Sequence, residues 1–127
     1  METITYVIIG EPIALARPRH GRNNQIYDSQ RNEKLVNGIT LLSQHKDNPM
    51  YTGPIHLDVT FFMTIYPRAK RKSGFHMYTP DLDNMIKWVC DISNSILFDD
   101  DCIVAKITAS KVYDPKPRTE FTLKALE

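Results

Sequence analysis

The sequence predicts an α/β (α+β) protein, in which two main helices pack against one mixed β-sheet. Segments with the two-residue period of β-strands alternate with segments of helical period, in the order β-α-β-α-β-β. The chain has 127 residues, of which 42% are hydrophobic and 24% are charged. This is the size and composition of one globular domain with its own core. We therefore expect a single domain over residues 1–127, and not a disordered chain, a repeat array or a disulfide-stapled miniprotein.

The first half of the chain predicts a strand, a loop and a helix. Residues 3–9 are almost wholly β-branched or aromatic, which indicates a strand covered on both faces. Residues 10–28 form a polar, basic stretch that we interpret as a loop. A helix follows over residues 29–44, and the apolar residues expected on one side of it are Leu35, Ile39 and Leu42.

The second half predicts a strand, a helix and two further strands. Apolar and polar residues alternate over residues 55–65, which indicates a strand with one buried face. The second helix spans residues 83–96, with an apolar stripe of Met85, Val89, Ile92 and Ile96 and an opposite face of Asn84, Lys87, Asp91 and Asn94. Strands are then expected over residues 103–110 and 118–126, separated by a turn at residues 114–117.

Charge and cysteine content narrow the class of protein. The net charge is only +1, so affinity for a polyanion must come from the arrangement of the charges. The two cysteines, Cys90 and Cys102, form no CxxC pair and are interpreted as reduced packing residues. No apolar stretch approaches the ~18 residues of a membrane-spanning helix. We expect a soluble, cytoplasmic protein with no membrane contact and no organic cofactor.

An acidic cluster is the most informative feature. Residues 81–101 contain six aspartates and one lysine. Pro80 disfavours helical backbone before it, and in an extended segment the side chains of Asp81 and Asp83 would point to the same side. Two carboxylates so close repel each other unless a cation lies between them, and Mg²⁺ prefers such oxygen ligands. The triplet Asp99–Asp101 supplies a third carboxylate only if the chain doubles back along a helix of ~21 Å.

Simpler interpretations of these aspartates remain open. Asp83 has the position of a helix N-cap, and the aspartate triplet has the composition of a solvated turn. A calcium-binding EF-hand is excluded, because Met85 and Ile86 stand where that loop needs an oxygen ligand and a glycine. The chain also lacks the GxxxxGK[ST], HExxH, GxSxG and GxGxxG motifs.

Basic residues gather in two segments that each precede an element with carboxylates. The first segment contains Arg17, Arg19, His20 and Arg22, and the second contains Arg68, Lys70, Arg71 and Lys72, with His76 and Tyr78 just before the acidic cluster. Cations around a metal-holding carboxylate pocket suit an enzyme that binds a DNA backbone and cuts it. The alternative is that each segment is an ordinary solvated loop.

Two strings of residues resemble the RusA family of Holliday-junction resolvases. The family motifs PDxDN..K and DD.QI/V are matched by Thr79-Pro80-Asp81-Leu82-Asp83-Asn84-Met85-Ile86-Lys87 and by Leu97-Phe98-Asp99-Asp100-Asp101-Cys102-Ile103-Val104. The start of the chain is similar to the family pattern G.P...RPR....YD, through Gly10, Pro12, Arg17-Pro18-Arg19 and Tyr27-Asp28. The resemblance therefore extends along nearly the whole chain.

The resemblance implies a small homodimeric enzyme, common in phages and prophages, that cuts branched DNA with Mg²⁺, for which Mn²⁺ is a plausible substitute. By position, Asp81, Asp83 and Asp100 match the metal-binding aspartates, and Lys87 matches the lysine implicated in catalysis. Asp99 and Asp101 remain rivals to Asp100. Cys102 departs from the family, which usually has Gln at that place, so this chain lacks an amide there that could position DNA.

We therefore predict a Mg²⁺-dependent endodeoxyribonuclease that resolves Holliday junctions or other branched DNA in recombination and repair by paired hydrolysis. The residues expected to bind DNA are Arg17, Arg19, Arg68, Lys70, Arg71, Lys72 and His76. Three alternatives stay open: a junction-binding module that does not cut, a metal nuclease acting on flaps or forks, and, least favoured, a structural subunit.

Overall fold

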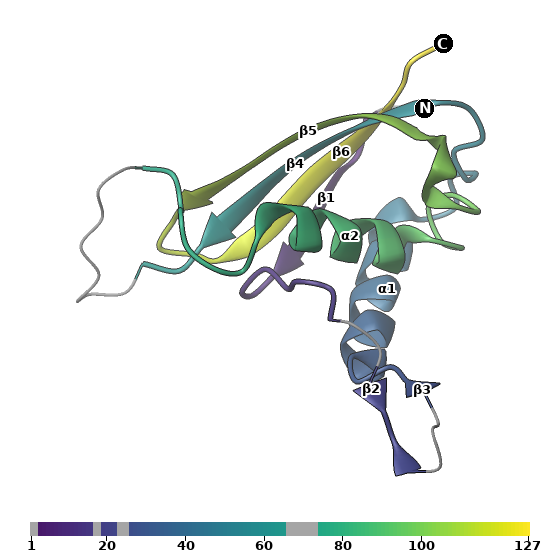
Figure 1. Ribbon diagram of the computed structural model, residues 1–127. Coiled ribbons are helices and arrows are strands. Elements are labelled where there is room, and N and C mark those ends of the chain that lie inside the picture. The colour runs from purple at the N-terminus through teal and green to yellow at the C-terminus, as the bar shows by residue number, and fades with distance from the viewer. Residues whose placement is uncertain (1–2, 17–18, 23–25, 66–73) are drawn as a thin grey trace.

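The molecule is built on one four-stranded mixed sheet with two helices on one side of it (Figure 1). The computed structural model describes residues 3–16, 19–22, 26–65 and 74–127. In the sheet order β1-β6-β4-β5, only the β4–β5 pair is parallel. The strands are β1 (Thr5–Ile9), β4 (Ile55–Met63), β5 (Val104–Tyr113) and β6 (Arg118–Ala125), and the helices are α1 (Arg31–His45) and α2 (Leu82–Ser93). The predicted fold class and element order are confirmed.

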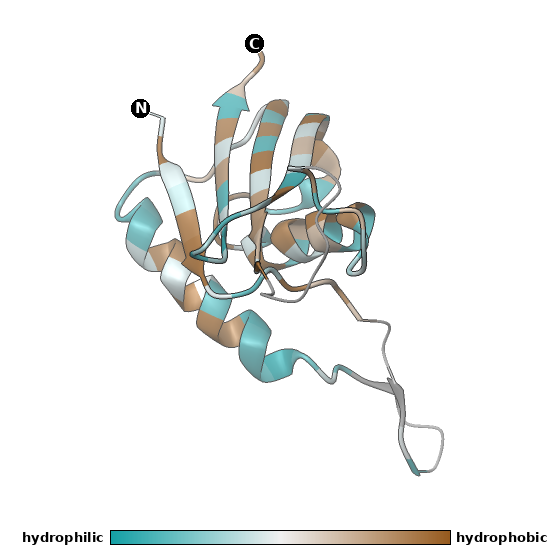
Figure 2. Cartoon of the chain, turned by 90° about the vertical axis from the view of Figure 1, so that its left-hand side faces the viewer, coloured by the Kyte–Doolittle hydropathy of each residue, from teal (hydrophilic) through white to brown (hydrophobic). Residues whose placement is uncertain are grey.

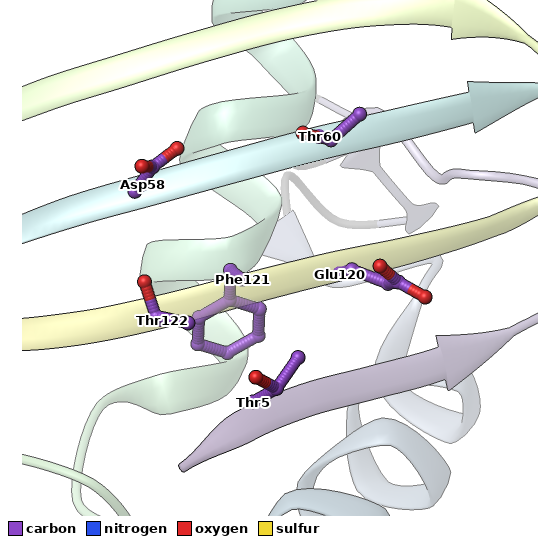
Figure 3. A pocket seen from close by; sticks show the side chains of 6 residues that line it. All are labelled: Thr5, Asp58, Thr60, Glu120, Phe121 and Thr122. Carbon is purple, nitrogen blue, oxygen red and sulfur yellow. The ribbon is translucent and has the colours of Figure 1, made fainter. Parts of the chain in front are cut away.

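The sheet has one buried face and one open face. Every second residue of β4, from Ile55 to Met63, is buried, as the alternation predicts. In β1 only Tyr6 and Ile8 are buried, so the expectation of a strand covered on both faces is wrong. On the open face the strands are lined by polar side chains around a shallow hollow of about 190 Å³ (Figure 3), namely Thr5, Asp58, Thr60, Glu120 and Thr122.

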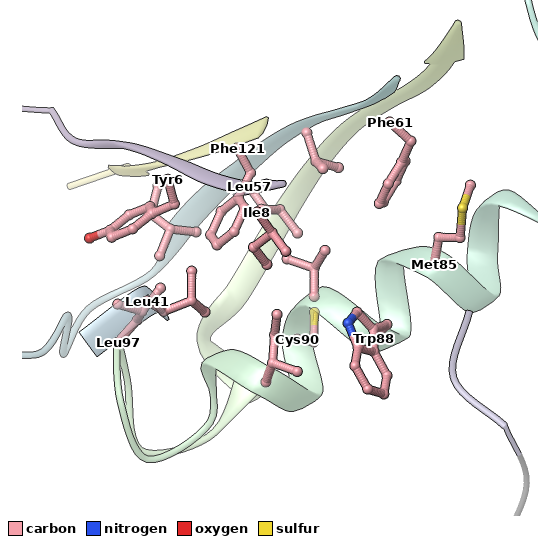
Figure 4. Close-up of a cluster of buried hydrophobic side chains, with 14 of the residues drawn as sticks. Tyr6, Ile8, Leu41, Leu57, Phe61, Met85, Trp88, Cys90, Leu97 and Phe121 are labelled. Carbon is pink, nitrogen blue, oxygen red and sulfur yellow. The ribbon is translucent and has the colours of Figure 1, made fainter. Parts of the chain in front are cut away.

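Helix α2 covers the buried face of the sheet and contributes apolar side chains to the core. Its residues Met85, Trp88, Val89 and Ile92 are buried against the sheet (Figure 4). The fourth member of the predicted apolar stripe, Ile96, lies beyond the end of the helix, in the turn that follows it. The predicted buried face is therefore confirmed for the residues that belong to the helix.

The predicted apolar side of α1 is wrong. Leu35, Ile39 and Leu42 are 64%, 58% and 55% exposed, and apolar bands are visible on the outside of this helix in Figure 2. The side facing the protein instead consists of Asn37, Gly38, Leu41 and His45. Two of these residues are polar, and burial costs them little because each is hydrogen-bonded. The indole Nε1 of Trp88 donates to Asn37 at 3.0 Å, and Nδ1 of His45 lies 2.7 Å from the Tyr6 hydroxyl oxygen.

Gly38 lets the turn after α2 approach α1. A Cβ atom at this position would lie 3.0 Å from Cδ1 of Ile96, closer than ordinary van der Waals contact. The glycine thus provides the space into which Ile96 packs.

The basic loop at the start of the chain holds two short strands. β2 (Arg19–His20) and β3 (Ile26–Tyr27) pair antiparallel at the far end of α1 (Figure 1). Strands of two residues are too short to leave a periodic signal, so the sequence predicts only a loop here. In the described ranges no helix is long and apolar enough to cross a membrane. Both cysteines are free, with Cys90 buried and Cys102 exposed.

Candidate active site

Asp81 and Asp83 lie at the first turn of α2, and both are exposed to solvent. Asp81 has extended backbone, with φ −71° and ψ 143°, and the helix begins at Leu82. The expectation that the segment 81–83 is extended, with Asp83 as the cap, is therefore wrong: the cap position is held by Asp81, two residues earlier. Both carboxylates still stand at the positive end of the helix dipole, which stabilises negative charge there.

The segment before Asp81 is fastened to the end of β5 by Lys111. The backbone N–H of His76 donates to the Lys111 carbonyl at 2.9 Å, and that of Tyr113 donates to the Gly74 carbonyl at 3.2 Å. The Nζ of Lys111 donates to the carbonyls of Tyr78 and Pro80, at 2.6 and 2.8 Å. The sequence pattern gave no reason to select Lys111, because its role depends on the path of a loop.

Lys111→Met is expected to lower the free energy of unfolding by about 1–2 kcal/mol, because two hydrogen bonds from a charged donor are lost. Urea denaturation followed by circular dichroism measures the change. The matched control is Lys106→Met, an exposed lysine of the same strand whose side chain makes no hydrogen bond to the described residues. Equal stability of the two variants would contradict the fastening role.

His76 is packed among aromatic rings beside this segment. Its ring lies 6.0 Å from that of Tyr78 and 5.3 Å from that of Tyr113, measured between centroids. Burial, and then the positive charge of Lys111, lower the pKa of His76 below its usual value. The ring is therefore neutral near pH 7, and its expected part in DNA binding stays a prediction.

Further along α2, Lys87 lines the space between the helix and β5. An open cavity of about 340 Å³ lies here, lined by Leu15, Ile86, Lys87, Cys90, Asp91, Asp101, Val104 and Ile107. Burial, and then the carboxylates of Asp101 and Asp91, raise the pKa of the Cys90 thiol to about 11. Of the aspartate triplet, it is Asp101 that faces this cavity.

Asp91 is already engaged in an ion pair. Lys34 of α1 lies 2.9 Å from the Asp91 carboxylate and also pairs with Asp28. Asp28 accepts hydrogen bonds from Lys34 and from the backbone of Gln30, which lower its pKa. These contacts join the end of the basic loop to both helices and leave Asp91 a structural role.

Asp100 lies at the other end of the molecule from Asp81 and Asp83. It is exposed, it precedes the short 3₁₀ helix η2 (Asp101–Ile103), and its carboxylate accepts a hydrogen bond from the Cys102 backbone at 3.3 Å. Asp100 precedes the first residue of β5. Asp81 instead follows the segment that is held by Lys111, and Lys111 is the eighth residue of β5.

The distance between the two acidic ends is set by this length of strand. Seven residues of β-strand span about 20 Å, and Figure 1 shows η2 and the start of α2 at opposite ends of the helix. No group of three or more His, Cys, Asp or Glu within the described residues is placed to hold a metal ion. The expectation that Asp81, Asp83 and Asp100 converge within one chain is therefore wrong.

Most of the expected DNA-binding residues lie outside the described part of the chain. These are Arg17, Arg68, Lys70, Arg71 and Lys72. Arg19 begins β2, but its side chain is likewise outside the description. Their role in binding DNA stays a prediction.

The donor set of the acidic ends suits a hard divalent cation. Asp81 and Asp83 offer exposed carboxylate oxygens, the ligands preferred by Mg²⁺ and Mn²⁺. Lys87 lies one helical turn from Asp83, within reach of a phosphate bound there. Of the three expected carboxylates, one end of α2 therefore presents Asp81 and Asp83, and the other end presents Asp100.

The family model of endodeoxyribonuclease RusA matches residues 10–124. The chain therefore belongs to the RusA family of endodeoxyribonucleases, hydrolases that cut the backbone of DNA at branched junctions, and the predicted family is confirmed. Among curated proteins it is similar to the uncharacterized protein YqaN of Bacillus subtilis (strain 168). The two are 30% identical over 138 residues, which cover 98% of this chain and 97% of the relative.

Proposed function

We propose that the protein is a Mg²⁺-dependent resolvase of Holliday junctions and related branched DNA, active in the cytoplasm as a homodimer. Each active site would combine Asp81 and Asp83 of one chain with Asp100 of the other. The observation that carries this proposal is the placement of the two acidic groups at opposite ends of α2. A two-fold axis that sets two α2 helices antiparallel brings unlike ends together twice, once at each end.

The residues of such a site have distinct roles. Asp81 and Asp83 are held at the helix N-terminus and would bind the ion with Asp100 of the second copy, Mn²⁺ being a plausible substitute for Mg²⁺. When bound, the ion supplies Lewis-acid chemistry, activating water and neutralising charge on the phosphate. Lys87 projects from the same helix and would stabilise negative charge that develops on the phosphate or on the leaving oxygen.

The two-fold arrangement also suits the substrate. Resolution of a four-way junction needs two symmetric cuts, and a symmetric dimer presents two equivalent sites to them. The residues proposed to hold the DNA backbone by charge are Arg17, Arg19, Arg68, Lys70, Arg71 and Lys72. His76, whose ring is neutral near pH 7, is proposed to assist them as a hydrogen-bonding group and not as a cation.

Removal of divalent ions is the direct test. We expect the protein to cut a synthetic four-way junction in Mg²⁺ and to stop cutting it in excess EDTA, while binding measured by gel shift persists. Parallel assays on a flap, a fork and a linear duplex separate a junction resolvase from a nuclease with another target. Binding without cleavage in either Mg²⁺ or Mn²⁺ would identify a junction-binding module and refute the proposal.

A further inference from the structure

β5 is an edge strand with an open outer side. It pairs with β4 along one side. Among the described residues, its other side is contacted by a strand-like bridge only near its end, where Phe75 pairs with Val112. The four residues from Ala105 to Thr108 are exposed, and Ile107 is 47% exposed although it belongs to the sheet. Unpaired strand edges offer their backbone groups to another strand.

The direction of the backbone groups follows from the contacts at the end of β5. The Lys111 carbonyl and the Tyr113 N–H bond to residues 76 and 74, so both residues turn their peptide groups away from β4. Residues two apart in a strand turn them the same way. Ile107 and Ala109 therefore direct an N–H and a C=O to the open edge, where no other described residue bonds to them.

We infer that β5 pairs antiparallel with β5 of a second copy, with Ile107 opposite Ile107, and that this pairing builds an eight-stranded sheet through the dimer. The inference rests on the proposed function and identifies the surface that assembles the active site. A strand paired with its own copy forms an isologous interface, in which the same groups of both chains meet.

The register follows from the position of the aspartates. With Ile107 opposite Ile107, Lys111 lies opposite Ile103 of the second copy. Lys111 holds the segment that leads into Asp81, and Ile103 lies three residues after Asp100. This pairing sets the Asp81–Asp83 end of each α2 beside the aspartate triplet of the other chain. Centring the pair on Ala109 moves the triplet four residues along the strand, about 13 Å farther from Asp81.

The composition of the edge suits a second strand. Protected edges carry charges, prolines or bulges. Here the stretch from Ile107 to Ser110 contains none of these, and the irregularity of β5 lies before it, where the β4 register shifts between Ile55 and His56. Ile107 also lines the cavity that contains Lys87, so a second copy at this edge would lie next to that lysine.

Ile107→Pro tests the interface. Proline removes the N–H that points to the open edge and leaves the ladder to β4 intact, and edge positions of this kind tolerate it. Light scattering after gel filtration is expected to show a shift from a dimer to the 14.7 kDa monomer, with an unchanged circular dichroism spectrum and loss of junction cleavage. The matched control is Leu35→Asp, on the exposed apolar side of α1, which is expected to remain dimeric.

A cross-link provides a second measurement, which detects the dimer directly and does not depend on losing it. Directly opposite residues of antiparallel strands have Cα atoms about 5.5 Å apart, within the range of a disulfide. In a Cys102→Ser background, Ile107→Cys is expected to give a dimer on a non-reducing gel after treatment with oxidised glutathione. Leu35→Cys in the same background is expected to stay monomeric on that gel.

The outcomes separate this inference from the proposed function. A dimeric Ile107→Pro, a monomeric wild-type chain, or cross-linking through Leu35→Cys instead of Ile107→Cys would overturn the β5 interface. If the shared active site is demonstrated while Ile107→Pro stays dimeric, the proposed function stands and the interface is elsewhere. If Ile107→Cys cross-links but the wild-type dimer does not cut DNA with Mg²⁺ or Mn²⁺, the interface stands and the proposed function fails.

Discussion

Asp83→Asn is expected to abolish cleavage of a four-way junction while leaving its binding intact. The substitution keeps the shape of the side chain but replaces an anionic oxygen ligand with a neutral amide, which hard divalent cations bind less well. We expect the cleavage rate to fall at least about a thousandfold, which corresponds to about 4 kcal/mol of lost transition-state stabilisation. Single-turnover cleavage and gel shift on the same junction measure the two properties separately.

The matched control is Asp58→Asn. Asp58 is an exposed aspartate of β4 that lines the open face of the sheet, away from α2 (Figure 3). It is expected to keep both binding and cleavage. Full cleavage by Asp83→Asn would remove the metal-holding role given to the start of α2.

The second large effect is a restoration of activity. Asp83→Asn and Asp100→Asn chains are each expected to be inactive alone, because every active site of either dimer lacks one carboxylate. In a mixed dimer one site contains both substitutions, and the other contains neither. An equal mixture with free exchange of chains should therefore recover roughly a quarter of the wild-type sites. The product should be singly nicked junctions, resolved from paired cuts on a denaturing gel.

A second mixture controls this experiment. Asp81→Asn and Asp83→Asn alter the same half of the site, so no mixed dimer of these two chains has an intact site. This mixture is expected to stay inactive under conditions in which the first recovers activity. If differently tagged chains exchange but the first mixture also stays inactive, then the three carboxylates do not form a site shared between chains.

Local patterns predicted the sheet and α2 because their core faces are apolar. The alternation in β4 and the stripe of Met85, Val89 and Ile92 correspond directly to burial. In α1 the same reasoning failed, because Asn37 and His45 are buried through hydrogen bonds and not through apolar surface. A pattern based on hydropathy cannot identify a polar residue whose partner lies on another element.

The candidate site likewise has one part that local sequence predicts and another part that it does not. Asp81, Asp83 and Lys87 belong to one short motif, and the structure places them together on the start of α2. The position of Asp100 depends on the turn after the helix and on the direction of β5, which no short-range pattern reports. The role of Lys111 depends on the segment that crosses its strand.

The close approach of Ile96 to Gly38 links α1 to the acidic end of the molecule. Ile96 belongs to the short connection that carries the chain from α2 to the aspartates before β5. A methyl group on the α-carbon of Gly38 would press on Cδ1 of Ile96, and the end of that side chain would have to shift by a few tenths of an ångström. A residue with no functional group thus decides how closely the link into the aspartate triplet rests on a helix from the first third of the polypeptide.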